Sequence, residues 1–298
     1  MSEFLSSSER AVLTALCDAF VPSLEPLPGD DPEFFSLAAS ARDVPRRVEE
    51  TLAGLTDGDK SRFRLFLRMV DQPFFMALQC GRPARFASLA PDAAERFLAA
   101  LSSSRIPDLR SAFQAVRRLA TFHYYSASTG RLDDPVWRAI GYTPSLNPPA
   151  ISSPVNLTPI ERDVVLDCDA CVVGSGAGGS VIAAELAAAG VDVIVLEAGS
   201  DWQSEQFDQR EEPGTRELFL DGGATATRDL AISLFAGASI GGGTTVNWQT
   251  SLRTPDDVRA DWAERSGCAH FTSESFTQSL DAVWQRLSIG TTESTPNR

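Results

Sequence analysis

Residues 170–199 read ACVVGSGAGGSVIAAELAAAGVDVIVLEAG, and this stretch decides the fold of the region around it. An apolar run over 170–173 leads into a glycine-rich turn, a run of helix-forming residues and a second apolar run that ends at Glu197. The order strand, turn, helix, strand predicts a βαβ unit, which opens a doubly wound α/β domain. We therefore expect an α/β, Rossmann-like fold here.

The turn GSGAGG has the spacing GxGxxG, with glycines at Gly174, Gly176 and Gly179. After a strand and before a helix, the first glycine permits a tight turn, the second admits a diphosphate, and the third allows close helix packing. The free N–H groups at the start of the helix would face the anion. The whole turn, including Ala177 and Gly178, is therefore a candidate dinucleotide-binding segment. Four apolar residues of the helix are expected to face the sheet: Val181, Ile182, Leu186 and Ala189.

Glu197 ends the second strand and lies 23 residues after Gly174, because 197 − 174 is 23. An acid about 20 residues after the first glycine is expected to bind the adenosine ribose of a dinucleotide. A carboxylate at this place accepts hydrogen bonds from both ribose hydroxyls and repels a 2′-phosphate. The sequence therefore favours a dinucleotide other than NADP.

A second glycine cluster, Gly241, Gly242 and Gly243, occurs in the stretch SIGGGTTVNW at 239–248. Glycines allow a flat ring system to approach the backbone closely. An ordinary NAD domain would continue directly into its next strand and helix, so this cluster favours a flavin. The alternative is a surface loop that is rich in Gly and Thr for other reasons.

The first half of the chain has a different pattern, with apolar residues at helical spacing and no period-two alternation. Five helices are predicted, one from about Ser8 to Pro22 and the others over 44–55, 59–70, 92–101 and 106–126. A proline-rich connector follows. We predict an all-helical domain over 1–143, a linker over 144–161, and the first part of a nucleotide-binding domain over 162–298.

Composition excludes several classes of protein. The formal charge of −14 argues against nucleic-acid binding. No signal peptide or run of about 20 apolar residues is present, so we expect a cytoplasmic chain without a transmembrane segment. Of the five cysteines, Cys168 and Cys171 should face opposite sides of a strand. With only His123 and His270 besides, no metal site is expected.

Taken together, the strand–GSGAGG–helix–VLEAG unit, the stretch GASIGGGTTVNW and the following LRTP resemble the glucose-methanol-choline (GMC) oxidoreductases. Two stretches of the helical half, ALCDAFVPS and VWRAIGY, are similar to the N-terminal part of the long-chain fatty alcohol oxidase branch. The resemblance covers nearly the whole chain.

The resemblance implies an FAD-dependent enzyme that oxidises alcohols, with hydride passing to the flavin and a histidine taking the hydroxyl proton. It places the first glycine turn at the FAD diphosphate and Glu197 at the ribose. It places the residues Gly241 to Gly243 and Asn247 beside the flavin, and Thr250 at the ring system or diphosphate. The expected partners are an alcohol substrate and either an electron-acceptor protein or the missing C-terminal half. The electron acceptor is left open between oxygen, a quinone and a cytochrome. Peripheral membrane association is also left open.

In the resembled family the catalytic histidine lies near the end of a longer chain, so this sequence is expected to be an N-terminal part without the catalytic region. His123 is expected to be a packed helix residue and His270 a solvent-exposed one, so no catalytic residue is assigned. An incomplete sheet is expected to leave apolar surface exposed.

Two alternatives remain open, namely an NAD-dependent dehydrogenase domain and a non-catalytic nucleotide-fold module that binds a partner.

Several other conspicuous residues are expected to have structural roles. Asp256 and Asp257 are expected at a helix N-cap and first turn. Two arginine doublets are expected on solvated helix faces: Arg46, Arg47, Arg117 and Arg118. Four phenylalanines are expected in the helix core: Phe63, Phe66, Phe74 and Phe75.

Overall fold

The computed structural model describes residues 4–81, 83–127, 133–143, 157–227 and 232–290. The chain divides into two compact units, residues 1–246 and 247–298. The first unit holds the helical half and the βαβ segment. Most of the proline-rich connector lies outside the described residues, and the predicted domain boundary at 144–161 stays a prediction.

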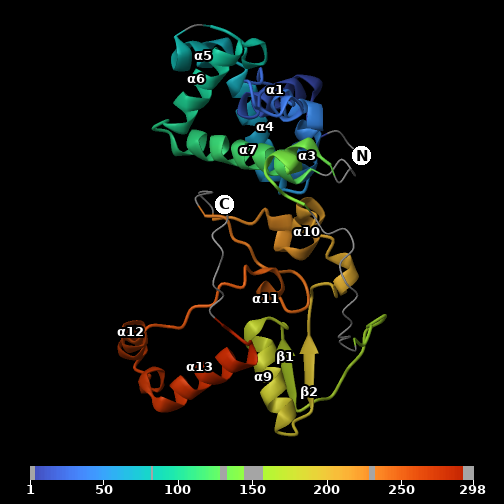
Figure 1. Ribbon diagram of the computed structural model, residues 1–298, viewed down its shortest axis with the longest axis vertical. Helices are drawn as coiled ribbons and strands as arrows, with labels where there is room; N and C mark the ends of the chain where they lie inside the picture. The colour runs from blue at the N-terminus through green and yellow to red at the C-terminus, as the bar shows by residue number, and fades with distance from the viewer. Residues whose placement is uncertain (1–3, 82, 128–132, 144–156, 228–231, 291–298) are drawn as a thin grey trace. The chain divides into compact units, whose positions relative to one another are not determined.

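Helices follow one another through the described part of residues 4–143 (Figure 1). All five predicted helices are present: α1 Ser7–Phe20, α3 Val44–Ala53, α4 Asp57–Val70, α6 Pro91–Ser102 and α7 Pro107–Ser126. Three shorter α-helices are additional: α2 Pro32–Phe35, α5 Pro73–Cys80 and α8 Pro135–Ala139. Two 3-10 turns are also present: η1 Ser40–Arg42, between α2 and α3, and η2 Phe86–Ser88, between α5 and α6. The additional α-helices start at prolines, which suit a first helical position, but they are too short to give a detectable period.

The first helix begins with a capping box. The Glu9 N–H donates to the Ser6 hydroxyl at 3.3 Å, and the Ser6 N–H donates to the Glu9 carboxylate at 2.8 Å. The same carboxylate accepts from Arg68 at 2.7 Å and from Arg64 at 3.2 Å, both on α4. Glu9 is 2% exposed, so the cap of one helix also anchors its neighbour.

The core of the helical half is formed by apolar side chains of α1, α3, α4, α6 and α7. Phe63 and Phe66 are buried there as predicted, and Phe75 packs at its edge. The prediction for Phe74 is wrong, because its side chain is 83% exposed. Adjacent positions on a helix point about 100° apart, so Phe74 and Phe75 cannot both face one core.

A buried ion pair closes this half of the chain. The Arg42 guanidinium lies 3.0 Å from the Asp134 carboxylate, and both side chains are at most 3% exposed. Arg42 also donates to the carbonyls of Tyr124 and Ala127, while Asp134 caps α8 by accepting from the Val136 N–H. The end of α7 and the start of α8 are thereby tied to η1.

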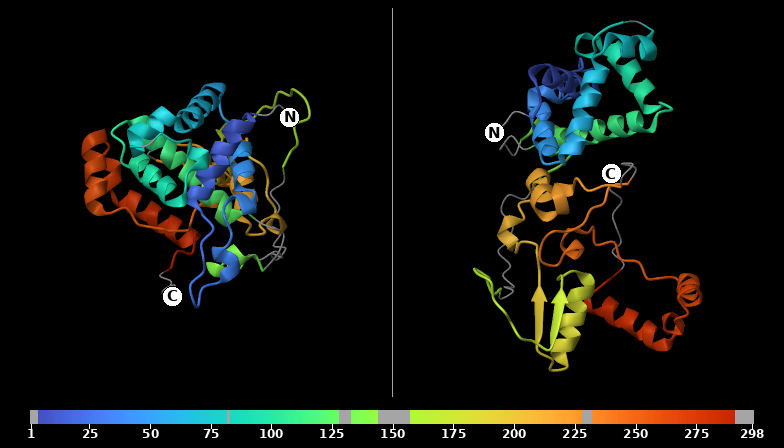
Figure 2. Two further views of the ribbon diagram at one scale, coloured as in Figure 1. Left: turned by 90° about the horizontal axis from the view of Figure 1, so that it is seen from above. Right: turned by 180° about the vertical axis from the view of Figure 1, so that it is seen from behind.

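The βαβ unit is confirmed by β1 Ala170–Val173, α9 Ala177–Ala188 and β2 Val193–Leu196. The strands are parallel, with Ala170 opposite Val193 and Val173 opposite Leu196. Helix α9 lies along one side of the two strands (Figures 1 and 2). This arrangement brings the ends of both strands to the same edge, beside the start of α9.

The expected burial of the α9 face is only partly correct. Val181 and Ile182 are 51% and 56% exposed, whereas Leu186 is half-buried. Ala189 follows the helix as its C-cap. Within the described residues the sheet has two strands, which are too narrow to cover the helix face. The same narrowness leaves Val173 83% exposed, so the expected exposed apolar surface is present.

The chain after β2 returns to the βαβ unit through short elements. These are η3 Ser204–Gln206, α10 Glu211–Leu218, η4 Leu220–Gly223 and α11 Gly243–Val246. Single bridges pair Ser200 with Ser239 and Phe219 with Gly237. The first of these pairings brings the second glycine cluster back to the end of β2.

The second unit contains α12 Asp256–Ser266, η5 Ala269–Thr272 and α13 Glu274–Arg286. Asp256 and Asp257 both lie in the first turn of α12, and the N-cap is Pro255, so the predicted N-cap position was one residue late. Arg259 organises this unit by donating to the carbonyls of Phe271 and Ser273.

Among the helices that the structure describes, none combines the length and the apolar character needed to cross a bilayer.

Candidate nucleotide-binding site

The first glycine turn has the geometry that its sequence predicts. Gly174 has φ +92°, a conformation that glycine adopts without strain. A methyl group on Gly179 would lie 1.9 Å from the Gly174 carbonyl oxygen and 3.2 Å from Val172 Cγ1. Gly179 is therefore required for the close packing of α9 on β1. Gly176 is the N-cap of α9, and no side chain caps the first N–H groups of this helix.

Glu197 lies against this turn, immediately after β2. Its Oε2 accepts from the Ser175 N–H at 2.8 Å and from the Ser175 hydroxyl at 2.6 Å. Its Oε1 accepts from the Gly199 N–H at 2.7 Å. These hydrogen bonds, led by the Ser175 hydroxyl, lower the pKa of the Glu197 carboxyl, which is therefore ionised at neutral pH.

The second glycine cluster meets the first at the same place. The Gly241 N–H donates to the Ser175 hydroxyl oxygen at 3.0 Å. A methyl group on Gly242 would lie 3.1 Å from the Gly176 Cα, so the two glycine segments are in close backbone contact. The structure thus brings Gly174, Gly176, Glu197 and the 241–243 cluster together. The sequence identified each of these motifs, but it did not show that the two glycine segments are in contact.

Two further glycines shape the site and were missed in the sequence analysis. A methyl group on Gly199 would lie 2.5 Å from the backbone of Ala238, and one on Gly237 would lie 2.2 Å from the Gly242 carbonyl oxygen. Both glycines let the second cluster approach the end of β2. Both glycines lie in stretches that carry the family resemblance, VLEAG for Gly199 and GASIGGGTTVNW for Gly237, but neither stretch reveals these backbone contacts. Ser175 was also missed, because it occupies a variable position of GxGxxG.

The residues of this site fit a dinucleotide. A methyl group on Gly176, Gly178 or Gly243 would have no atom within 4 Å. Open space therefore lies beside both glycine segments. The uncapped start of α9 presents N–H groups to an anion. Besides the Ser175 and Gly199 donors, the Ala198 N–H also interacts with the Glu197 carboxylate, so a ribose hydroxyl would share an acceptor oxygen such as Oε1 with these N–H groups.

Asn247 and Thr250 belong to the second unit, which begins at Asn247. Both side chains are exposed, and the Asn247 side-chain oxygen Oδ1 accepts from the Gln249 N–H at 2.8 Å. Their predicted positions beside a flavin stay predictions.

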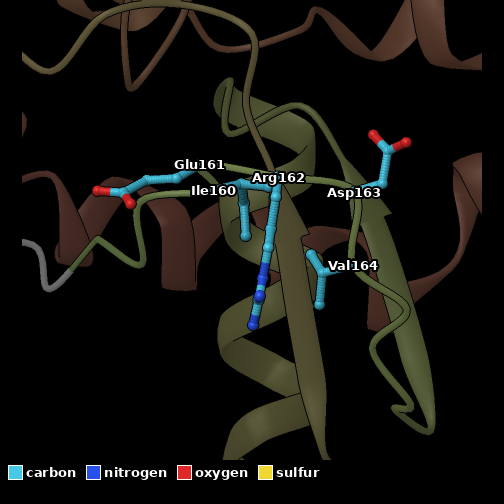
Figure 3. Close-up of a pocket in the computed structure, with 5 residues that line it drawn as sticks. All are labelled: Ile160, Glu161, Arg162, Asp163 and Val164. Carbon is cyan, nitrogen blue, oxygen red and sulfur yellow. The ribbon is translucent and has the colours of Figure 1, made fainter.

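A separate hollow of about 590 Å³ is lined by Ile160, Glu161, Arg162, Asp163 and Val164. Figure 3 shows that the Glu161 and Asp163 carboxylates point in different directions, and these five consecutive residues are all exposed. The hollow is bounded by a single stretch of coil, and none of the predicted site residues lines it. It is therefore a surface feature without convergent chemistry.

The two histidines have the structural environments that the sequence predicts. His123 is 5% exposed within α7, and its Nε2 lies 2.9 Å from the Thr51 hydroxyl. His270 is exposed, and its ring packs edge-on against Phe276. Neither histidine contacts the glycine turn in any described interaction.

Three of the four arginines in the doublets are exposed as expected, namely Arg46, Arg117 and Arg118. Arg47 differs, because its guanidinium pairs with Glu212 on α10 and its side chain is only 22% exposed. Together with His123, whose Nδ1 lies 3.5 Å from the same carboxylate, Arg47 holds the pKa of Glu212 at about 2. The doublet pattern does not reveal this pair, because the partners are distant in sequence.

Comparison with known proteins identifies the class. Residues 172–231 match the family model of an NAD(P)-binding Rossmann-like domain, and residues 215–298 match that of the GMC oxidoreductases. The chain is therefore similar to Rossmann-like dinucleotide-binding domains and, in a stretch that overlaps this match from residue 215 onward, to the GMC oxidoreductases.

Individual relatives agree with this class. The long-chain-alcohol oxidases FAO3 and FAO4B of Arabidopsis thaliana are 27% and 28% identical over 96% and 95% of this chain, but only 46% and 44% of their own length is covered. An uncharacterised GMC-type oxidoreductase of Mycobacterium tuberculosis is 39% identical over 128 residues, which is 42% of this chain and 20% of the relative. No solved structure matches.

The chain is thus similar to the GMC oxidoreductases over residues 215–298, and its similarity to the long-chain-alcohol oxidases extends over nearly all of it. This confirms the family resemblance found in the sequence. The chain spans less than half the length of these alcohol oxidases.

Proposed function

We propose that this chain is the dinucleotide-binding part of an FAD-dependent oxidoreductase that acts on the CH–OH group of alcohols. The observation that supports the proposal best is the meeting of the first glycine turn, Glu197 and the second glycine cluster around Ser175. In a plain NAD domain the second cluster would have no evident purpose. Long-chain alcohols are the first substrates to test, because the relatives that match most of this chain are named for them.

In this proposal each residue has a role in binding. The N–H groups at the start of α9 and the open side of Gly176 hold the diphosphate. Glu197 accepts a hydrogen bond from the adenosine ribose, while Gly241 to Gly243 allow the flat ring to lie against the backbone. Asn247 and Thr250 contribute to the flavin side. When bound, FAD would supply the hydride acceptor for the alcohol carbon.

The proposal also includes an organisation of the chain. Residues 1–143 would form a separate helical domain, and 144–161 would link it to the nucleotide-binding part. Within the described residues, the buried apolar core supports this division, since its members lie between Leu5 and Val136. The alcohol and an electron acceptor would be the partners of the whole enzyme.

An NAD-dependent dehydrogenase domain is the second candidate. The match of residues 172–231 to an NAD(P)-binding domain favours it, because the same βαβ unit serves both dinucleotides. The two candidates differ in whether the second glycine cluster contacts a ligand. A binding experiment therefore separates them.

The test is calorimetric titration of the purified chain with FAD, NAD and NADP. We expect FAD to bind more tightly than NAD, and NADP to bind most weakly. Glu197→Ala should weaken FAD binding about ten-fold or more, because a hydrogen bond to a charged group is lost. Glu185→Ala removes an exposed carboxylate from α9 and serves as the control. Tighter binding of NAD than FAD would replace the first candidate with the second.

A further inference from the structure

The Ser175 hydroxyl connects three separate parts of the chain. It donates to Glu197 Oε2 at 2.6 Å and accepts from the Gly241 N–H at 3.0 Å. Its partners lie 22 and 66 residues away in sequence. The bridge therefore joins the turn before α9 to the end of β2 and to the second glycine cluster.

The chemistry of the partners fixes the direction of both hydrogen bonds. A backbone N–H can only donate, so the Gly241 amide must use the hydroxyl oxygen as its acceptor. An ionised carboxylate can only accept, so the hydroxyl proton points to Glu197. A serine hydroxyl, which is attached directly to Cβ, can donate one hydrogen bond and accept another, so it meets both requirements.

The bridge holds Glu197 and the second glycine cluster beside each other. Glu197 Oε2 is fixed by the hydroxyl and the N–H of Ser175, while Oε1 accepts from the Gly199 N–H. Gly241 has φ +85° and Gly242 has φ +54°, so the second cluster has an unusual conformation that a specific contact stabilises. Without the bridge, the Gly241 amide would lose its described acceptor.

We propose that Ser175 is a positioning residue of the dinucleotide site, which holds Glu197 and the second glycine cluster in the arrangement that a ligand requires. The inference rests on the proposed function for the identity of the ligand. It assigns a specific role to a variable position of GxGxxG, where the fingerprint itself demands no side chain.

Three variants separate this role from a general structural one. Ser175→Ala removes both hydrogen bonds, and Ser175→Thr retains a hydroxyl at the same place. Ser180→Ala is the matched control, because Ser180 lies in the first turn of α9 and its hydroxyl donates to the Ser175 carbonyl oxygen, not to Glu197 or Gly241.

The first measurement needs no ligand. Amide hydrogen exchange of Gly241, followed by NMR on the full 298-residue chain, should be faster in Ser175→Ala than in the wild type. The Ser175→Thr and Ser180→Ala variants should exchange at the wild-type rate. Unchanged exchange in Ser175→Ala would show that the bridge does not hold the second cluster, and would overturn the proposal.

The second measurement uses ADP and 2′,3′-dideoxy-ADP as probes in calorimetric titrations. Ser175→Ala should weaken ADP binding about ten-fold, the effect of one hydrogen bond to a charged group. It should weaken dideoxy-ADP binding much less, because that ligand offers no hydroxyl to Glu197. Equal losses for both ligands would show that Ser175 does not act through Glu197, and would overturn the proposal.

The outcomes also separate this inference from the proposed function. If the wild-type chain binds ADP but not FAD, the FAD assignment fails while the Ser175 comparison is still decided with ADP. If FAD binds and the two ADP ligands lose affinity equally, the function stands and the role of Ser175 fails. Absence of binding to every adenine nucleotide would overturn both.

Discussion

Gly178 and Gly179 are adjacent in sequence, but the structure has room for a side chain only at Gly178. A methyl group on Gly179 would lie 1.9 Å from a backbone carbonyl oxygen, whereas one on Gly178 would have no atom within 4 Å. Gly179→Ala should destabilise the ligand-free chain by about 1–3 kcal/mol, because the backbone must move. Gly178→Ala should stabilise it by about 0.5–1 kcal/mol, since alanine favours a helix over glycine.

The measurement is urea unfolding of both variants, followed by circular dichroism. A destabilised Gly178→Ala together with an unaffected Gly179→Ala would contradict the packing of α9 on β1. The fingerprint predicted that Gly179 allows close packing, but it could not distinguish the two adjacent glycines by the space around them.

The contact between α1 and α4 should depend on pH through Glu9. Burial alone would raise the pKa of Glu9, but hydrogen bonds from the Ser6 N–H and from Arg68 and Arg64 outweigh it and lower the pKa to about 2. Because the folded-state pKa lies below the ordinary value of 4.5, the stabilisation is complete above pH 4.5 and is lost as the pH falls toward 2.

Glu9→Gln tests this directly, since glutamine can still complete a capping box but carries no charge. The wild type should exceed the variant in free energy of unfolding by about 1–2 kcal/mol at neutral pH, as expected for charged hydrogen bonds that are partly exposed. The difference should shrink between pH 4.5 and 2 in denaturant titrations. Glu50→Gln, which removes an exposed pair with Arg46, should show little difference at any pH. A difference that persists at pH 2 would contradict this account.

At the scale of the whole molecule, the two-stranded sheet leaves apolar side chains in contact with water. Val173 and Leu196, which lie opposite each other on one face of the sheet, are 83% and 50% exposed. Exposed apolar patches promote association, so the isolated chain should self-associate as its concentration rises. The double variant Val173→Thr/Leu196→Thr should reduce association in sedimentation velocity experiments with little change in stability. Leu65→Gln, at an exposed position of α4, is the control and should leave association unchanged. Association that is equal in all three proteins would show that this surface is not responsible.

Local sequence patterns were sufficient to predict much of the secondary structure of this molecule. The five longer helices of the first half, the βαβ unit and the glycine fingerprint were predicted because their period, turns and caps lie within short stretches of sequence. The short helices and the exposure of Phe74 were not predicted, because a few residues give no period and adjacent positions are hard to orient.

The arrangement of the site depends on contacts between distant residues. The chain's own pattern identified Glu197 and both glycine clusters, but only the folded structure shows that Ser175 joins them and that Gly199 and Gly237 allow their approach. The ion pair of Arg47 with Glu212 was hidden for the same reason. Periodicity reports which face of an element is apolar, whereas a hydrogen bond or a backbone contact across 66 residues requires the chain to be folded first.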